Sequence, residues 1–141
     1  RELICIPAGT VSDEVISTID LLPTIARITG AKLPDHAIDG LDVSAVLADP
    51  QAPSPRREAG FFYYKNNRVE AVRLGKWKLH LNTKGDELKP GALYDLDADI
   101  SESKDLASAH ADVVARIAAL AAKYDAELKA NRRPIWRAGG R

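Results

Sequence analysis

An apolar stripe near the end of the sequence predicts a long amphipathic helix. Its five members are separated by four, three, four and four residues, which is the spacing of one face of an α-helix. We predict that this helix runs from about His110 to Asn131. A helix of this kind is stable when another element covers its apolar face, so the rest of the chain has to supply an apolar surface. The stripe consists of Val113, Ile117, Leu120, Tyr124 and Leu128.

Four short segments before this helix have the residue types of β-strands. In the third segment Trp77, Leu79 and Leu81 alternate with polar residues, so these three side chains share one face of a strand. Asparagines predict a tight turn at residues 65–68, and we predict a polar loop at residues 82–91. The sheet and the helix can cover each other, which is typical of an α+β unit. The predicted strands are residues 61–64, 69–74, 76–81 and 92–96.

The first fifty residues predict a strand and two helices. Residues 3–6 form a short apolar run, and a helix follows at about residues 18–29, with Ser17 and Asp20 as a capping box. A shorter helix is expected at residues 43–47. These elements are too few to enclose a core of their own.

The longer of these two helices has an apolar face without a partner among the predicted elements. Leu21, Leu22, Ile25 and Ile28 form that face, and the chain holds no large sheet for it to pack on. An exposed apolar surface of this kind marks an interaction site. We therefore expect residues 1–50 to belong to a larger domain, and we expect the isolated chain to associate with itself.

Three prolines lie within six residues at positions 50–55. Proline fixes φ and removes a backbone donor, so we interpret residues 51–58 as a Pro-rich linker. The predicted organisation is residues 1–50 as the edge of a larger domain, then the linker, then residues 59–141 as the unit of sheet and helix.

The charge balance excludes two classes of partner. Twenty basic and twenty acidic residues cancel among 141 residues, whereas nucleic-acid and membrane-surface binding both favour a basic excess. The sequence begins with Arg1 and contains no methionine, so we expect the natural start to lie upstream.

Several segments of the chain have the residues, order and spacing of motifs in a known family. They are VSD at residues 11–13, STIDLLPTIA at 17–26, GAKLP at 30–34, IDGLD at 38–42, AVRLGKWKL at 71–79, LYDLDAD at 93–99 with Glu102 after it, and DLA at 105–107. In this order and spacing they resemble the end of sulfatases of the arylsulfatase A type, in the alkaline phosphatase superfamily. The pattern departs from the family at Ile100, where proline is frequent, and at Asp105, where asparagine is frequent.

This resemblance implies the architecture and the chemistry of a longer enzyme. Residues 1–50 would close an alkaline-phosphatase-like α/β large domain, and residues 59–141 would form its C-terminal subdomain of four antiparallel strands and a helix. The intact enzyme would hydrolyse sulfate esters with a formylglycine and a calcium ion, and a periplasmic or secreted location fits it. The implied partners are the missing N-terminal catalytic domain and a sulfated small molecule or glycan.

The catalytic residues and metal ligands of that family lie upstream of this segment, so we predict none here. The run that begins at Cys5 resembles the nucleophile motif of the family, but Gly9 stands in the place of its arginine, so we interpret Cys5 as structural. Two groups of aspartates match no calcium loop, and we interpret them as turn formers and caps. They are Asp35, Asp39 and Asp42, and then Asp95, Asp97 and Asp99.

Cations gather on the polar face of the third predicted strand. Lys76 and His80 lie on it, Arg73 lies on the neighbouring strand, and Lys84 lies in the loop that follows. Such a cluster attracts an anionic substrate, and the C-terminal domain of the family borders the active-site cleft. We predict that these four residues rim the substrate cleft; the alternative is an ordinary solvated sheet face.

Two other functions stay open at this point. A phosphate or phosphonate ester hydrolase on the same scaffold would share these elements and would differ in its upstream nucleophile. A non-enzymatic interaction module would be a stable monomer with a closed surface, whereas a large apolar patch on residues 1–50 would identify the chain as part of a larger protein.

Overall fold

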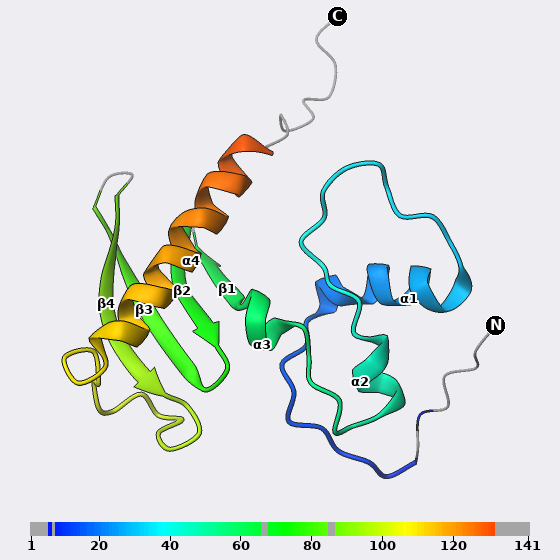
Figure 1. Ribbon diagram of the computed structural model, residues 1–141, viewed down its shortest axis with the longest axis horizontal. Helices are drawn as coiled ribbons and strands as arrows, with labels where there is room; N and C mark the ends of the chain where they lie inside the picture. The colour runs from blue at the N-terminus through cyan, green and yellow to red at the C-terminus, as the bar shows by residue number, and fades with distance from the viewer. Residues whose placement is uncertain (1–5, 7, 66–67, 85–86, 132–141) are drawn as a thin grey trace, which may run out of the picture.

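A computed structural model describes residues 6, 8–65, 68–84 and 87–131. Figure 1 shows two parts: a sheet with one long helix lying across it, and a second part of short helices and long loops. The short turn α3 (Arg56–Ala59) stands between them.

The sheet has four strands that are all antiparallel and follow the order of the sequence, β1-β2-β3-β4. This meander confirms the predicted four-stranded sheet. Its strands are β1 (Phe61–Lys65), β2 (Arg68–Leu74), β3 (Trp77–Lys84) and β4 (Glu87–Asp95).

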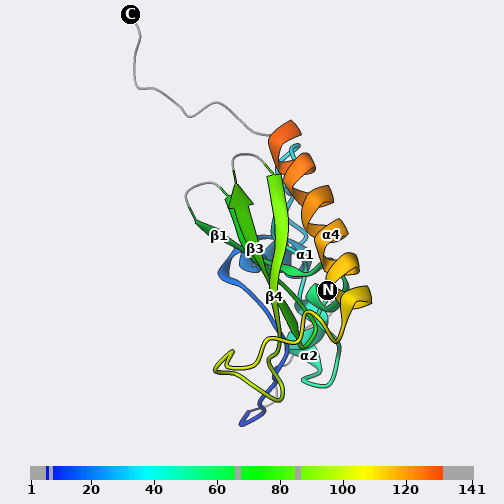
Figure 2. The ribbon, with the colours of Figure 1, turned by 90° about the vertical axis from the view of Figure 1, so that its left-hand side faces the viewer.

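Helix α4 (Ala111–Ala130) covers one face of this sheet, as Figure 2 shows from the side. Ile117 and Ala121 of the helix are fully buried, and Trp77 packs at the edge of the same core. The predicted helix, its apolar stripe and its contact with the Trp77 face of the sheet are therefore confirmed. The buried core consists of Val69, Val72, Leu74, Leu79, Leu81, Leu93, Ile117 and Ala121.

The polar loop predicted at residues 82–91 is wrong, because most of this segment is strand. Strand β3 continues to Lys84 and β4 begins at Glu87, so the two strands form a long hairpin. Pro90 lies inside β4 opposite Leu81, where the register shifts. Proline is tolerated there because β4 is the last strand of the sheet and its outer edge needs no backbone donor.

The other part of the molecule contains η1 (Thr18–Asp20), α1 (Leu21–Thr29) and α2 (Ser44–Ala48). The backbone N–H of Ser17 donates to Asp20 Oδ2 at 2.8 Å, as the predicted cap requires. Helix α1 ends at Gly30, whose φ of 75° lies in the left-handed region that glycine adopts readily. The strand predicted at residues 3–6 lies outside the described residues, except for Ile6.

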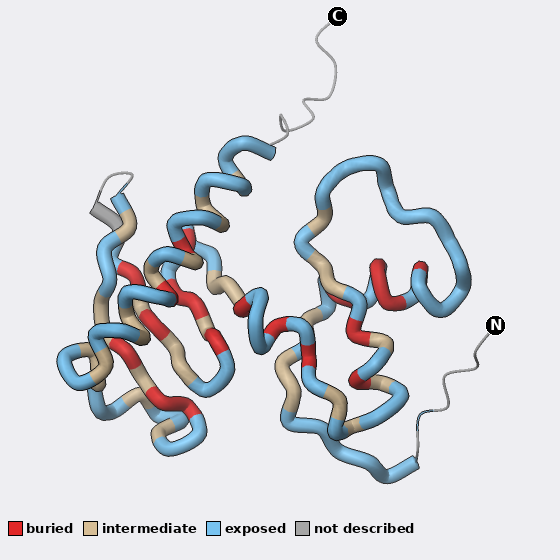
Figure 3. The backbone as a smooth tube through the Cα atoms, viewed as in Figure 1, coloured by how far each residue is buried: buried red, intermediate tan, exposed pale blue. Residues whose placement is uncertain are grey.

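The apolar face of α1 is exposed, as the sequence predicts. Leu21, Leu22 and Ile25 are 55%, 53% and 54% exposed, and Ile28 is 36% exposed. Figure 3 shows buried residues in the sheet and also along part of α1, whereas the rest of α1 is exposed. This exposed face, which also includes Ile19, is called the α1 face below.

The Pro-rich segment at residues 51–58, predicted to be a linker, is packed in part. Ser54 and Arg56 are only 2% and 5% exposed. Ser54 Oγ donates to the carbonyl oxygen of Val15 at 2.7 Å, and the Ser54 N–H donates to Glu14 Oε2 at 2.9 Å. The prolines shape a fixed junction here, because its polar groups are bonded back to the segment before α1. The domain boundaries stay a prediction.

Candidate functional site

The face of the sheet away from α4 carries a polar cluster of Lys78, His80 and Glu102. Glu102 accepts from Lys78 Nζ through one carboxylate oxygen, and its other oxygen lies 2.6 Å from His80 Nε2. The hydrogen bond from Lys78 lowers the pKa of the Glu102 carboxyl below its ordinary value, although burial opposes this shift. Glu102 has a φ of 55°, which is unusual for a residue with a side chain.

Two tyrosines frame this cluster. Lys78 Nζ lies 4.8 Å from the centroid of the Tyr63 ring, and the His80 ring meets Tyr94 edge to face with centroids 5.4 Å apart. The His80 side chain is 43% exposed, whereas Lys78 is 17% exposed. The arrangement can hold a polar ligand through His80, but Glu102 compensates the positive charge that the sequence predicts there.

Two of the other predicted rim residues, Lys76 and Arg73, have hydrogen-bond partners of their own. Lys76 Nζ pairs with Asp95 Oδ2 at 2.6 Å and lies 4.8 Å from the Trp77 ring centroid. Arg73 pairs across the strands with Lys78 in register, and its Nε donates to the carbonyl oxygen of Gly75 at 3.0 Å. Lys84 ends β3, and its side chain lies outside the described part of the chain.

Glu102 was not among the predicted site residues. It lies in the segment between β4 and α4, more than twenty positions from both of its partners. Asp99 holds this segment in place by accepting from the backbone N–H groups of Ser103 and Lys104 at 2.8 and 2.9 Å. No local pattern in the sequence indicates that the carboxylate of Glu102 turns towards β3.

A buried ion pair between Asp20 and Arg56 joins the two parts of the molecule. Asp20 is fully buried, and Arg56 Nε donates to its Oδ2 at 2.8 Å while Arg56 Nη2 contacts its Oδ1. The backbone N–H groups of Ser17 and Leu41 add two more donors at 2.8 Å. Burial raises the pKa of Asp20, but Arg56 and these donors outweigh it, so the net pKa is lowered.

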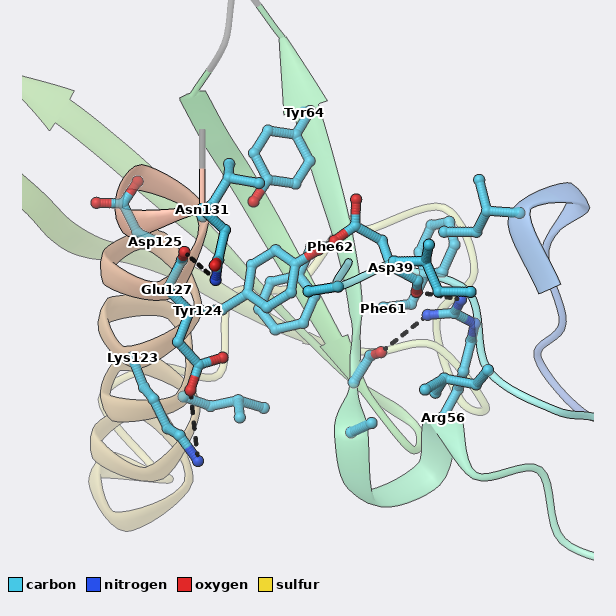
Figure 4. Close-up of a pocket in the computed structure, with 18 of the residues that line it drawn as sticks. Asp39, Arg56, Phe61, Phe62, Tyr64, Lys123, Tyr124, Asp125, Glu127 and Asn131 are labelled. Carbon is cyan, nitrogen blue, oxygen red and sulfur yellow. Dashed lines mark hydrogen bonds and ion pairs between the residues drawn. The ribbon is translucent and has the colours of Figure 1, made fainter. Parts of the chain in front are cut away.

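A groove opens beside this ion pair, between the segment before α2, the start of β1 and the second half of α4. Its volume is about 750 Å³. Figure 4 shows Asp39, Tyr64 and Tyr124 around it, each from a different element. Tyr124 donates from its hydroxyl to Asp39 Oδ1 at 3.2 Å and stacks on Phe62 with centroids 3.8 Å apart. Sequence reasoning missed this groove, because its walls are distant in the chain.

Among the described residues, no three His, Cys, Asp or Glu side chains meet in a group that could hold a metal ion. Cys5 lies outside the described residues. None of the described helices is long and apolar enough to cross a membrane.

Known proteins resemble this chain in sequence. Residues 54–137 match the family model described as the C-terminal region of aryl-sulfatase. The chain is 34% identical to human arylsulfatase A over 120 residues, which are 70% of this chain and 24% of that protein. It is 38% identical to pig N-acetylgalactosamine-6-sulfatase over 79 residues, which are 55% of this chain and 14% of that protein. The chain thus spans about a quarter or less of these curated relatives.

Solved structures resemble it in fold. Ps i-CgsB in complex with k-i-k-neocarrahexaose superposes with a TM-score of 0.70 at 23% identity, covering 92% of this chain and 28% of that chain. BT4656 in complex with its substrate D-glucosamine-2-N,6-O-disulfate gives a TM-score of 0.65 at 23% identity, covering 89% of this chain and 27% of that chain. Identity at this level establishes the shared fold alone.

Proposed function

The chain belongs to the sulfatase family, as the C-terminal region of an arylsulfatase-type protein, and we propose that it acts as the packing and cleft-bordering part of a longer sulfuric ester hydrolase. In that protein the α1 face contacts the catalytic domain, and the Asp20–Arg56 pair fixes the C-terminal subdomain to it. The chemistry belongs to the rest of the polypeptide.

The exposed α1 face is the observation that carries this proposal. Pro23, Thr24 and Ala26 are the buried residues of α1, while its largest apolar side chains face outwards. A contiguous apolar surface of this kind marks a contact with another protein surface. A closed interaction module would not present it, and the sulfatase relatives extend well beyond the matched segment.

The cluster of Lys78, His80 and Glu102 is the part of the chain that we propose for the border of the substrate cleft. His80 is the most accessible of the three, so it is the residue that we assign to a polar group of a sulfated substrate. Glu102 holds the His80 ring in position and is itself paired with Lys78. Of the four predicted rim residues, Arg73 is the cross-strand neighbour of Lys78, and Lys76 is committed to Asp95.

Calcium and formylglycine are the cofactors that the family resemblance implies for the longer enzyme. We propose that both lie in the catalytic domain. A hard cation needs several carboxylate ligands at one point, and no group of three His, Cys, Asp or Glu side chains meets among the described residues. When bound there, they would supply the cation and the nucleophile for attack on the sulfate ester.

A chimera tests the structural role. In human arylsulfatase A, the matching C-terminal part is replaced by this chain, and hydrolysis of 4-nitrophenyl sulfate is measured. We expect at least tenfold more activity than in the truncated enzyme alone, and we expect the pair of changes Leu22→Asp and Ile25→Asp to abolish the gain. Ile100→Asp is the matched control, because Ile100 is exposed but lies in the other part of the molecule.

Two outcomes would contradict this role. One is full activity of the truncated enzyme without the chain. The other is hydrolysis of an aryl sulfate by the 141-residue chain alone in the presence of calcium.

The border role of His80 has its own test in the same chimera. We expect His80→Ala to raise KM at least fivefold for a sulfated oligosaccharide while leaving KM for 4-nitrophenyl sulfate unchanged, because only the longer substrate reaches the sheet. The assignment would be refuted if KM for each of the two substrates were the same in the variant as in the parent chimera.

A further inference from the structure

The groove between Asp39, Tyr64 and Tyr124 has the size and the lining of a small-molecule site. Its volume of about 750 Å³ lies within the range of known ligand pockets, which combine apolar walls with a few convergent polar groups. It lies on the α4 side of β1, because Phe62 and Tyr64 contact Tyr124 of α4. Tyr63 points to the opposite face, towards Lys78. The groove is therefore separate from the cluster around His80.

Aromatic rings form one side of this groove. Phe62 and Tyr124 are stacked with an interplanar angle of 10°, and the Tyr64 ring lies 6.2 Å from Tyr124 and is tilted against it. Tyr64 is 40% exposed, although it is a large apolar ring. A half-exposed ring beside a stacked pair offers a flat apolar surface to a ligand that is itself flat on one side.

Hydrogen-bonding groups converge on the same space. Asp39 Oδ1 accepts from the Tyr124 hydroxyl, and among the described residues Asp39 Oδ2 has no hydrogen-bond donor. Burial and the charge of Asp39 raise the pKa of Tyr124 to about 12, so Tyr124 remains a donor at neutral pH. Asn131 also lines the groove, and because its Nδ2 already donates to the carbonyl oxygen of Glu127 at 2.9 Å, it offers its Oδ1 as an acceptor. These groups suit a ligand with several hydroxyl groups.

Each cation that lines the groove has a carboxylate partner within the protein. Lys129 Nζ pairs with Asp125 Oδ2 at 2.7 Å, and Lys123 Nζ lies 3.9 Å from Glu127 Oε1. Arg56 is committed to Asp20. A sulfate or phosphate group would meet no uncompensated cation among these lining residues and would approach the carboxylate of Asp39.

The groove has an aromatic wall, hydrogen-bonding groups that suit hydroxyls, and cations that are already paired with carboxylates. From these three features we propose that it binds an uncharged pyranose unit of a glycan chain. The apolar face of the sugar ring lies on Tyr64, and its hydroxyl groups bond to Asp39 and Asn131. The proposed ligand carries no sulfate and its binding is measured without catalysis, so the proposal stands or fails independently of the catalytic role of the longer protein.

Binding is measured on the 141-residue chain by titration calorimetry and by amide chemical shifts. The probes are desulfated neocarrahexaose, cellohexaose and chitohexaose, together with native neocarrahexaose as the sulfated comparison. We expect at least one neutral hexasaccharide to bind with a Kd of about 1 mM or tighter and to shift the amides of Asp39, Phe62 and Tyr124.

Three variants locate the site. Tyr64→Ala and Asp39→Asn each weaken binding by about fivefold or more, as expected when one anchor of a small interface is removed. Tyr63→Ala leaves binding unchanged, because this adjacent tyrosine lies on the other face of the sheet. Unchanged near-ultraviolet circular dichroism shows that each variant is folded.

Three results would overturn the inference. The first is no binding of any neutral hexasaccharide at 5 mM, about five times the expected Kd. The second is binding that requires sulfate groups. The third is binding that Tyr63→Ala removes and Tyr64→Ala does not, which would place the sugar on the face of His80.

Discussion

Replacing Arg56 tests how the two parts of the molecule are held together. In Arg56→Met the carboxylate of Asp20 stays fully buried and loses its one charged partner. Breaking a buried pair in this way costs about 3–5 kcal/mol, because a buried charge is left uncompensated. That is a large share of the total stability of a domain, which is about 5–15 kcal/mol.

Urea denaturation followed by circular dichroism measures this change directly. We expect the free energy of unfolding to fall by about 3–5 kcal/mol, with a fall in Tm of about 10 °C for a chain of this length. The matched control is Arg57→Ala at the next position. Arg57 pairs with Glu14 but is 62% exposed, so its loss should cost less than about 1 kcal/mol.

A double variant shows whether the cost arises from the pair itself. Asp20→Asn removes the buried charge and keeps one acceptor oxygen for the donors of Ser17 and Leu41. We expect Asp20→Asn together with Arg56→Met to cost at least about 2 kcal/mol less than the sum of the two single changes. Additive costs, or a loss below about 1 kcal/mol in Arg56→Met, would refute the reasoning.

The remaining predictions concern the core, a close backbone approach and the polar cluster. Ile117 is fully buried, so Ile117→Ala should lower the free energy of unfolding by about 2–5 kcal/mol and Ile117→Val by about 1 kcal/mol; equal effects would contradict tight packing under α4. A Cβ at Gly40 would collide with the carbonyl oxygen of Ile19, so Gly40→Ala should cost about 1–3 kcal/mol in urea denaturation, and a neutral result would show that this approach is not fixed. The lowered pKa of Glu102 gives stability that is present above its unfolded pKa of about 4.3 and is lost as pH falls through the folded pKa. Glu102→Gln should therefore lower the urea midpoint at pH 7 and lower it less at pH 3; an equal effect at both pH values would contradict the pairing of its carboxylate with Lys78.

The sequence predicts those features that depend on local periodicity. The stripe on α4, the alternation in β3 and the cap at Ser17 each repeat within a few residues, and each was confirmed. The exposed α1 face followed from counting what the chain contains to cover it. The family was likewise predictable, because short motifs in the correct order are readable without a structure.

The features that the sequence does not predict depend on contacts between distant residues. The carboxylate of Asp20 indicated a cap, but its main partner Arg56 lies 36 positions away. The cation cluster was predicted without Glu102, so its charge was overestimated. The sequence predicts a shorter hairpin of β3 and β4 than the structure has. The reason is that Pro90 indicates a loop unless its place at the sheet edge is known.

Sedimentation equilibrium of the chain tests most directly that the α1 face is a contact surface for the rest of a larger protein. We expect the 141-residue chain to self-associate in a concentration-dependent way between about 1 and 100 µM, because an exposed apolar patch of this kind drives association. Leu22→Asp with Ile25→Asp should restore a monomer, whereas the exposed control Ile100→Asp should leave the association unchanged. A monomer across the whole concentration range would contradict the account.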